Sequence, residues 1–428
     1  MIKTIKICNF KSFDETEVNL GRFNVLIGAN AAGKSNFVSV FRFIKDIIEN
    51  GLEDAVSMQG GTGYIRNVNL GNAKNLSLEL SGDFTDNPST DTFFTRKEDD
   101  EEHFALVPTS FVYKFSIQFA QRGLGYKVVE EILRSNFDFE KGKDEGGKIR
   151  RIGKIGEGEI ILKTDEHGRV IYEFNKAGEV PLETEDIIFP ALVEKGKLSP
   201  KELFIGKMEY LFPHSLLIRR FLGSISIYDF DPRLSKTATS ISGKTELEPD
   251  GSNLAIVLRN ILAQKKKREK LYKLIKDFLP FIEDIMVEER SDTSVLAKLK
   301  EVYSGDFLPA FIISDGTINI TALIIALYFE EKPLIVFEEP ERNVHPYLIS
   351  KIINQMKDAS ERLKKQIIMT THNPEVVKYT DMKDILLLQR DKKGFSQISR
   401  PAEVKQVQIF LQNNMGIDKL FAQRLLEW

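Results

Sequence analysis

Residues 23–35 read Phe23-Asn-Val-Leu-Ile-Gly28-Ala-Asn-Ala-Ala-Gly33-Lys34-Ser35. The residues before Gly28 are mostly apolar and predict a strand, and the residues after Ser35 place apolar side chains at helical spacing. Between the two, Gly28 to Ser35 fits the pattern Gly-x-x-x-x-Gly-Lys-Ser/Thr in full, in the strand-loop-helix context that the pattern requires. This stretch therefore predicts an α/β fold with a phosphate-binding loop at a sheet edge.

The chemistry of this loop points to a nucleoside triphosphate with Mg²⁺. Glycines let the backbone wrap closely around phosphate oxygens, and the helix N-terminus offers unpaired N–H groups and a positive dipole. Lys34 would neutralise β/γ charge, and the hydroxyl of Ser35 can ligate Mg²⁺. A chance glycine-rich turn is the alternative, which the motifs farther along the chain disfavour. We expect these residues to contact the nucleotide: Gly28, Asn30, Gly33, Lys34, Ser35 and Asn36.

Length and composition exclude several classes of protein. The chain has 428 residues, of which 42% are apolar and 29% charged, and its net charge is −3. It is therefore neither disordered nor broadly basic, and any nucleic-acid site must be a local patch. One cysteine, Cys8, and an opening without an apolar signal core indicate a reducing, cytoplasmic setting. The longest strongly apolar stretch, Ala322–Phe329, is too short to span a membrane, and no Cys/His cluster has zinc spacing.

The sequence pattern changes twice along the chain. We expect residues 1–190 to form an N-terminal ATPase lobe, in which short alternating runs from Leu76 to about Phe174 predict an antiparallel β-subdomain. Residues 191–305 predict a mainly helical insertion, on the periodicity of Asn253–Leu262 and Leu271–Ile285. Residues 306–428 return to strand-helix-strand and predict a C-terminal ATPase lobe with a parallel sheet. The charged stretches Lys97–Glu102 and Lys141–Lys154 predict solvated loops.

Two adjacent carboxylates end a predicted strand in the C-terminal lobe. Leu334–Phe337 is apolar and is followed by Glu338 and Glu339. Because side chains alternate along a strand, Glu338 can face the Mg²⁺ region while Glu339 points toward a water in line with the γ-phosphate. A solvated acidic turn is the alternative, and we interpret the nearby Glu341 as a loop charge.

Two further motifs have weaker signals when taken alone. Ser314, Asp315 and Gly316 precede an apolar helix and aim its N-terminus at a ligand, although a simple helix cap explains them equally well. His372 follows the predicted strand Gln366–Thr370 and suits a group that senses the γ-phosphate, with a packed strand-end histidine as the alternative.

The order of these motifs resembles that of the ABC-type ATPases. The opening Ile5–Phe13 is similar to that of the SMC and RecF group of chromosome and repair ATPases. Four stretches resemble the stand-alone AAA-type proteins related to the OLD-family ATPases, namely Ser314–Thr317, Glu338–Pro346, Thr371–Pro374 and Leu247–Leu254. The resemblance implies an α/β, ABC-type P-loop ATPase head with a mixed sheet, an antiparallel β-subdomain and a helical insertion.

The resemblance also implies roles for single residues. Glu339 would be the general base, Glu338 the acid on the metal side and His372 the switch histidine. Ser314 and Gly316 would belong to a signature that closes over the ATP of a partner subunit.

Three departures from the family pattern concern the same site. Glu338 stands where these families usually have aspartate, so its reach to Mg²⁺ is one methylene longer. The Q-loop glutamine could be Gln59 or Gln118, although an ordinary polar residue is the favoured interpretation of each. Arg66 could act as an arginine finger, although a surface salt bridge is the favoured interpretation.

If the signature completes the site in trans, two heads must sandwich two nucleotides, so ATP binding would drive a dimerisation switch in a homodimer or higher oligomer. The segment between Ser35 and Ser314 lacks the sustained heptads of SMC arms, which favours the compact RecF/OLD type. The residues after the histidine strand are too few for the Toprim nuclease domain of OLD-family proteins. We therefore expect any effector to be a separate chain. The resemblance implies that this partner is a nuclease or toxin and that the protein acts in bacterial anti-phage defence.

Two alternatives remain open. The first is a RecF-like repair ATPase that binds DNA, with Lys265–Arg268, Lys270, Lys273 and Lys276 as a basic stripe on one helix. A solvated helix face explains this stripe equally well. The second is an ATP-gated scaffold with little turnover.

Overall fold

The computed structural model describes residues 1–84, 92–95, 102–144, 149–165, 167–178, 197–207, 213–291 and 293–403. The chain divides into two compact units. The first unit comprises residues 1–21, 39–225 and 390–398, and the second unit comprises residues 22–38, 226–389 and 399–428. The predicted three-part division, with boundaries after residues 190 and 305, stays a prediction.

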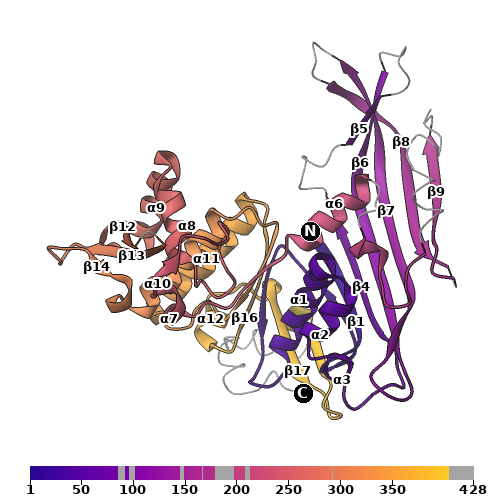
Figure 1. Cartoon of the computed structure of the whole chain (residues 1–428), viewed down its shortest axis with the longest axis horizontal. Coiled ribbons are helices and arrows are strands. Elements are labelled where there is room, and N and C mark those ends of the chain that lie inside the picture. Colours follow the sequence, from indigo (N-terminus) through magenta and orange to yellow (C-terminus); the bar gives the residue numbers. More distant parts are fainter. Residues whose placement is uncertain are drawn as a thin grey trace. The chain divides into compact units, whose positions relative to one another are not determined.

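The first unit is built on an antiparallel sheet with the strand order β2-β1-β4-β6-β7-β8-β9, to which β5 is added beside β6. Its longest strands, β6, β7 and β8, run side by side (Figure 1). The predicted antiparallel β-subdomain is confirmed. The strands are β1 (Ile2–Phe10), β2 (Phe13–Asn19), β4 (Leu76–Asp83), β5 (Thr92–Thr95), β6 (Glu102–Phe119), β7 (Tyr126–Asp144), β8 (Ile149–Thr164) and β9 (Val170–Gly178).

Alternation of apolar and polar residues explains why this sheet has one packed face. Along β4, buried residues alternate strictly with half-buried ones. The ring of Phe43 lies on this face, with its centroid 6.2 Å from that of Phe115 in β6. The helical elements of this unit are α2 (Leu52–Met58), α3 (Thr62–Ile65), η2 (Phe204–Gly206) and α6 (Pro213–Gly223). The helix α1 (Lys34–Asn50) begins in the second unit and continues into the first.

A buried carboxyl group in β7 fixes the short helix η2 to the sheet. Glu131 is fully buried and accepts hydrogen bonds from Tyr113 Oη at 2.9 Å, Phe204 N at 2.6 Å and Ile205 N at 3.1 Å. Burial raises the pKa of Glu131 to about 8, and the three donors oppose that rise. The sequence pattern gave no indication of this contact.

The predicted loop Lys141–Lys154 is wrong for the residues that the structure describes. Residues 141–144 continue β7 and residues 149–154 begin β8, and the two stretches pair with each other across a shift in register. Cross-strand ion pairs hold the charged residues in the sheet, because Arg151 Nε lies 3.2 Å from Glu140 Oε2 and Lys154 Nζ lies 2.9 Å from an oxygen of Asp138. Residues 97–101 of the other predicted loop lie outside the described part of the chain, and Glu102 begins β6.

The second unit contains a parallel sheet with the strand order β10-β15-β16-β3-β17. All residues of β3 and β16, and all but the last of β15, are buried, as continuous apolar runs in a parallel sheet require. The predicted parallel sheet is confirmed. The strands are β3 (Phe23–Ile27), β10 (Ser226–Tyr228), β15 (Leu334–Glu338), β16 (Gln366–Thr371) and β17 (Ile385–Arg390), and β18 (Ser396–Ser399) and η6 (Pro401–Glu403) follow along the chain.

Helices of the second unit pack around this sheet. The helix α10 is buried on all sides over Thr317–Leu327, as its uniformly apolar sequence predicts. One buried cluster joins Ile325 of α10, Ile335 of β15 and Ile352 of α11. The helical elements are α7 (Pro232–Ser235), α8 (Leu254–Leu262), α9 (Lys265–Phe278), η4 (Ala310–Ile312), α10 (Asp315–Tyr328), α11 (Pro346–Arg362), α12 (Pro374–Lys378) and η5 (Met382–Asp384).

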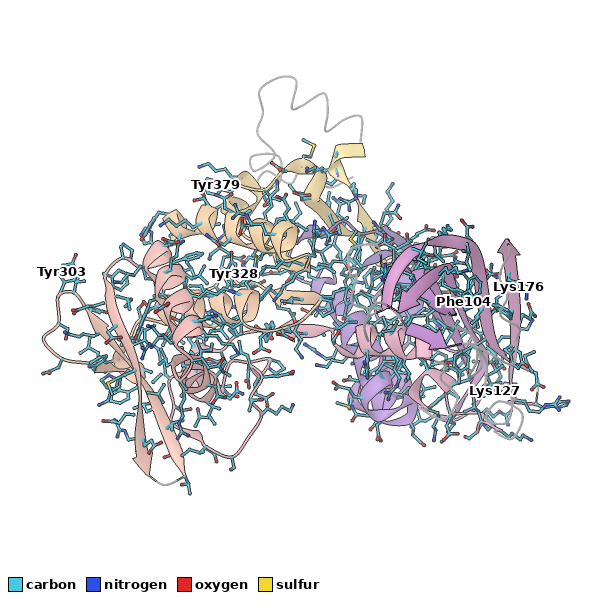
Figure 2. All side chains as sticks on the ribbon, turned by 90° about the horizontal axis from the view of Figure 1, so that it is seen from above. Phe104, Lys127, Lys176, Tyr303, Tyr328 and Tyr379 are labelled. Atoms are coloured by element: carbon cyan, nitrogen blue, oxygen red, sulfur yellow. The ribbon has the colours of Figure 1, made fainter. Side chains whose placement is uncertain are left out.

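A small antiparallel sheet corrects the predicted helix Leu271–Ile285. The helix α9 ends at Phe278, shortly before Pro280, which cannot continue a helix because it lacks an N–H group. The chain then enters β12, which pairs with β13, and β13 also pairs with β11 and β14. Figure 2 shows Tyr303 at the turn that follows β13, where it is 87% exposed. The strands are β11 (Thr239–Ser240), β12 (Ile282–Ser291), β13 (Ser294–Glu301) and β14 (Leu308–Pro309).

Candidate nucleotide and catalytic site

Three predicted motifs follow the ends of three neighbouring parallel strands in the second unit. Ile27 at the end of β3 is in register with Thr371 at the end of β16, and Glu338 at the end of β15 is in register with Thr370. The phosphate-binding loop, the paired acids and His372 therefore emerge at one edge of the sheet, which we call the carboxyl edge. Open α/β sheets bind their ligands at this edge.

Close backbone packing explains the first glycine of the phosphate-binding loop. A Cβ atom at Gly28 would lie 2.6 Å from the carbonyl oxygen of Leu388 in β17, closer than real Cβ contacts come. Gly33, with φ of +118°, adopts a backbone conformation that side chains disfavour, and α1 begins directly after it at Lys34. The loop and helix N-terminus thus have the expected form.

Lys34 turns back onto the loop. Its Nζ atom donates to the carbonyl oxygens of Gly28 at 2.8 Å and Ala29 at 3.1 Å. Burial lowers the pKa of Lys34, and the negative charges of Glu339 and Glu341 oppose that effect. The ammonium group therefore shares an electrostatic environment with the carboxylates after β15. Of the other predicted contacts, Asn30 and Ser35 are exposed and Asn36 is half-buried.

Glu339 and His372 are in direct contact. Glu339 Oε1 lies 2.6 Å from His372 Nδ1, and the backbone N–H of Glu339 donates to the Thr370 carbonyl at 3.0 Å. Glu339 has φ of +46°, which is unusual for a residue with a side chain and is typical of functional sites. The structure brings together the two residues for which the sequence predicted catalytic roles.

Glu338 ends β15 and is half-buried at the carboxyl edge. Together with the Ser35 hydroxyl, its carboxylate offers the hard oxygen ligands that Mg²⁺ prefers, and these donors fit the ion. Among the described residues, no group of three or more His, Cys, Asp or Glu side chains is arranged to hold a metal. Ligation by Ser35 and Glu338 stays a prediction.

Glu341 is not the solvated loop charge that the sequence suggested. It is 6% exposed, and its Oε1 accepts a hydrogen bond from Thr371 Oγ1. Burial raises the pKa of Glu341, and within the described part of the chain Oε2 has no hydrogen-bond partner. Thr371 Oγ1 also accepts from Asn373 N at 2.9 Å, so Glu341 helps to hold the segment that carries His372.

Within this chain, the predicted signature caps α10. Ser314 is the N-cap, and its Oγ accepts a hydrogen bond from Thr317 N at 3.2 Å. Asp315 forms an ion pair with Lys236. A Cβ atom at Gly316 would lie 2.6 Å from the carbonyl oxygen of Asn343, so the first turn of α10 packs directly against the loop after β15. Ser314 therefore caps α10, as the simpler of the two interpretations predicted. The contact of this segment with the ATP of a partner subunit stays a prediction.

Sequence reasoning missed Asp229 and Arg342. Arg342 Nη1 lies 3.1 Å from Asp229 Oδ1, and Arg342 Nη2 lies 3.3 Å from Glu339 Oε2. Asp229 directly follows β10, the neighbour of β15, so a fourth strand end contributes to the carboxyl edge. A pocket of about 410 Å³ lies here, lined by Glu339, Glu341, Arg342, Asn343, Val344, His372, Asn373 and Pro374.

The remaining candidates lie in the first unit. Gln59 is the C-cap residue of α2, and Gln118 is an exposed residue of β6. The guanidinium of Arg66 lies over the ring of Phe119, 5.4 Å from its centroid. This cation–π contact gives Arg66 a packing role in its own unit.

Two sequence families match the chain. A family described as "AAA ATPase domain" matches residues 1–143, and a family described as "AAA domain, putative AbiEii toxin, Type IV TA system" matches residues 224–378. No curated protein matches.

Among solved structures, the chain is similar to heads of SMC proteins. The SmcHead bound to the C-winged helix domain of ScpA is 13% identical, with 93% of this chain and 96% of that chain covered and a TM-score of 0.46. The SMC head domain from Thermotoga maritima is 12% identical, with 93% and 98% covered and a TM-score of 0.37. The Smc head domain bound to the C-terminal domain of ScpA derived from Pyrococcus furiosus is 14% identical, with 97% and 99% covered and a TM-score of 0.43. Likenesses of this strength do not establish a shared activity or partner.

The parallel sheet, the phosphate-binding loop and the two family matches support the class of ABC-type P-loop ATPases. Both matching families are described as AAA domains, one matching the first third of the chain and the other part of its second half. The finer resemblance to the OLD family stays a prediction. In the described part of the chain, no helix is long and apolar enough to cross a membrane.

Proposed function

We propose that this protein hydrolyses ATP, with Glu339 as the general base. The observation that carries the proposal is the 2.6 Å contact between Glu339 Oε1 and His372 Nδ1 at the carboxyl edge. A carboxylate held at a strand end can accept a proton from an attacking water, and His372 restrains its orientation.

The loop residues have distinct tasks in this proposal. The backbone N–H groups at the start of α1 and the ammonium of Lys34 bind phosphate oxygens. Lys34 already donates to two loop carbonyls, so it is held within the loop before phosphate arrives. Mg²⁺, when bound by Ser35 and Glu338, adds positive charge that stabilises the phosphates.

We further propose that ATP binding switches the oligomeric state. Ser314, Asp315 and Gly316 sit at the N-terminus of α10, and Ser314 is exposed. In the proposed homodimer, or a higher oligomer, this end closes over the nucleotide of a second copy, and hydrolysis resets the pair.

ATP turnover and solution mass test both parts. We expect the wild type to hydrolyse ATP, and Glu339→Gln to lose most turnover and to accumulate as an ATP-dependent dimer or larger assembly. The control is Glu361→Gln, which changes an exposed glutamate on α11 and should behave as wild type. Normal turnover by Glu339→Gln would contradict the assignment of the base. A stable ATP-bound dimer of the wild type with negligible turnover would instead indicate the ATP-gated scaffold.

For the biological role, we propose the ATPase component of an anti-phage system that controls a separate nuclease or toxin. The description of the family that matches residues 224–378 names a toxin, which supports a role in such a system. The test is phage challenge of cells that carry the gene with its neighbours, combined with purification of Glu339→Gln in ATP. Unchanged plaque counts and no co-purifying effector would oppose this role.

A second candidate function is DNA binding through α9. The side chains of Lys265, Lys266, Lys267 and Arg268 are exposed, as predicted. Lys270 is also exposed, but its Nζ donates to the Tyr328 carbonyl at 2.9 Å and lies over the ring of Phe329. Salt-dependent DNA binding that is lost when residues 265–268 become alanine, and kept when the exposed Lys392 and Lys393 do, would favour this function.

A further inference from the structure

The guanidinium of Arg342 bridges two carboxylates from different strand ends. Its Nη1 contacts Asp229 Oδ1 at 3.1 Å and its Nη2 contacts Glu339 Oε2 at 3.3 Å. Arg342 therefore reaches both the residue after β10 and the proposed base after β15. A planar guanidinium can use two nitrogens in this way, whereas the ammonium of lysine is a single point charge.

The backbone around this bridge is held on both sides. Arg342 N donates to the Glu339 carbonyl at 2.9 Å, and its own carbonyl accepts from Asn319 Nδ2 of α10 at 2.8 Å. Asn319 is 4% exposed, so the donor of this hydrogen bond is anchored in the interior of the protein. On the other side, Asp229 N donates to the Pro249 carbonyl at 2.9 Å. The bridge therefore starts from anchored backbone at each end.

Glu339 needs such a restraint to act as a base. The last torsion of a glutamate side chain has a broad, shallow energy profile, so a single contact leaves the carboxylate plane free to turn. His372 contacts Oε1 and Arg342 contacts Oε2. Two contacts on two oxygens fix the plane, and the remaining lone pairs can still accept a hydrogen bond from water.

We propose that Arg342, anchored by Asp229, is a positioning residue that orients the Glu339 carboxylate for ATP hydrolysis. This inference rests on the proposed function. It predicts a loss of kcat with little change in ATP affinity, because Arg342 acts through Glu339 and not through the nucleotide.

Four variants test this role. Arg342→Ala should lower kcat by about 10- to 100-fold, as expected when a reacting group is misplaced by about 1 Å. Asp229→Asn should cause a smaller loss in the same direction, and Arg342→Lys should not restore the wild-type rate. The matched control is Arg362→Ala, which removes an exposed arginine paired with Asp358 on α11 and should leave kcat unchanged.

Two measurements distinguish a positioning role of Arg342 from a contribution to stability alone. Millimolar guanidinium should partly restore kcat in Arg342→Ala, which a general packing defect would not allow. Combining Arg342→Ala with Asp229→Asn should be no worse than Arg342→Ala alone, because the two residues act through one bridge. ATP affinity and melting temperature are measured for every variant.

Unchanged or increased kcat in both Arg342→Ala and Asp229→Asn would overturn the inference, even if Glu339→Gln is inactive and the proposed function stands. An inactive wild type would instead overturn the proposed function and this inference with it. If Arg342→Ala does not fold, Asp229→Asn decides, since it keeps the shape of the side chain and removes only its charge.

Discussion

The substitution of Gly316 tests how closely the N-terminus of α10 packs against the loop after β15. A Cβ atom at this position would lie 2.6 Å from the carbonyl oxygen of Asn343, whereas ordinary contact begins at 3.4 Å. The overlap is 3.4 − 2.6 = 0.8 Å, and it falls on backbone that cannot rotate away. The substitution Gly316→Ala must therefore displace either the first turn of α10 or the loop after β15.

Helix propensity and packing predict opposite signs for this change. Replacing a helical glycine with alanine normally stabilises by about 0.5–1 kcal/mol. Overpacking of a close contact costs about 1–3 kcal/mol, and we expect it to prevail here. Subtracting the propensity gain leaves a net loss of up to about 2.5 kcal/mol, which in a unit of roughly 200 residues lowers the melting temperature by up to about 10 °C.

The assay is thermal unfolding followed by ATP turnover, with Gly305→Ala as the control. A Cβ atom at Gly305 would have no neighbour within 4 Å, so that variant should melt with the wild type. A Gly316→Ala protein that melts at or above the wild-type temperature would refute the packing argument. Normal stability combined with lost turnover would indicate that this glycine serves the nucleotide site and not the packing of α10.

Three further outcomes follow from contacts in the structure. Gly28→Ala should abolish ATP binding measured by a fluorescent nucleotide, because the new methyl group collides with the Leu388 carbonyl at 2.6 Å and distorts the loop. Thr371→Val should lower the free energy of unfolding by about 1–3 kcal/mol in denaturant titrations, because the buried carboxyl of Glu341 loses its donor; equal stability would show that this hydrogen bond contributes little. The pKa of Glu131 is raised from 4.5 to about 8, so between these two pH values the folded state keeps a proton that the unfolded chain releases. The protonated Glu131 contributes its full stability below pH 4.5, and this contribution is lost as the pH rises to about 8. Glu131→Gln should remove this decline in pH-dependent melting curves, and an unchanged slope would contradict the raised pKa.

The outline of the site was predictable because its parts are local. Gly28 to Ser35 combine a turn, a helix start and a lysine within eight consecutive positions, so one stretch of sequence specifies the loop. Glu339 and His372 each end an apolar run, and parallel strands place such ends at a common edge.

The errors have a physical cause in contacts between distant residues. Glu341 looked like a loop charge because its burial depends on Thr371, thirty positions away. The stretch Lys141–Lys154 looked like a loop because its charged side chains have no apolar partner nearby in sequence, and the ion pair between Arg151 and Glu140 forms only when β7 and β8 pair. The spacing of residues along one strand does not predict which side chains lie opposite them on the neighbouring strand.

The sequence by itself determined the chemistry and the order of the parts: a phosphate-binding loop, a helix cap, two acids and a histidine, each in its own local element. The tertiary structure decided which of them touch. The pairing of Glu339 with His372, and the bridge from Asp229 through Arg342 to Glu339, exist only because β10, β15 and β16 lie side by side in the sheet. Strand order in a parallel sheet is set by packing of the whole core, so no local pattern could have identified Asp229 as a neighbour of the proposed base.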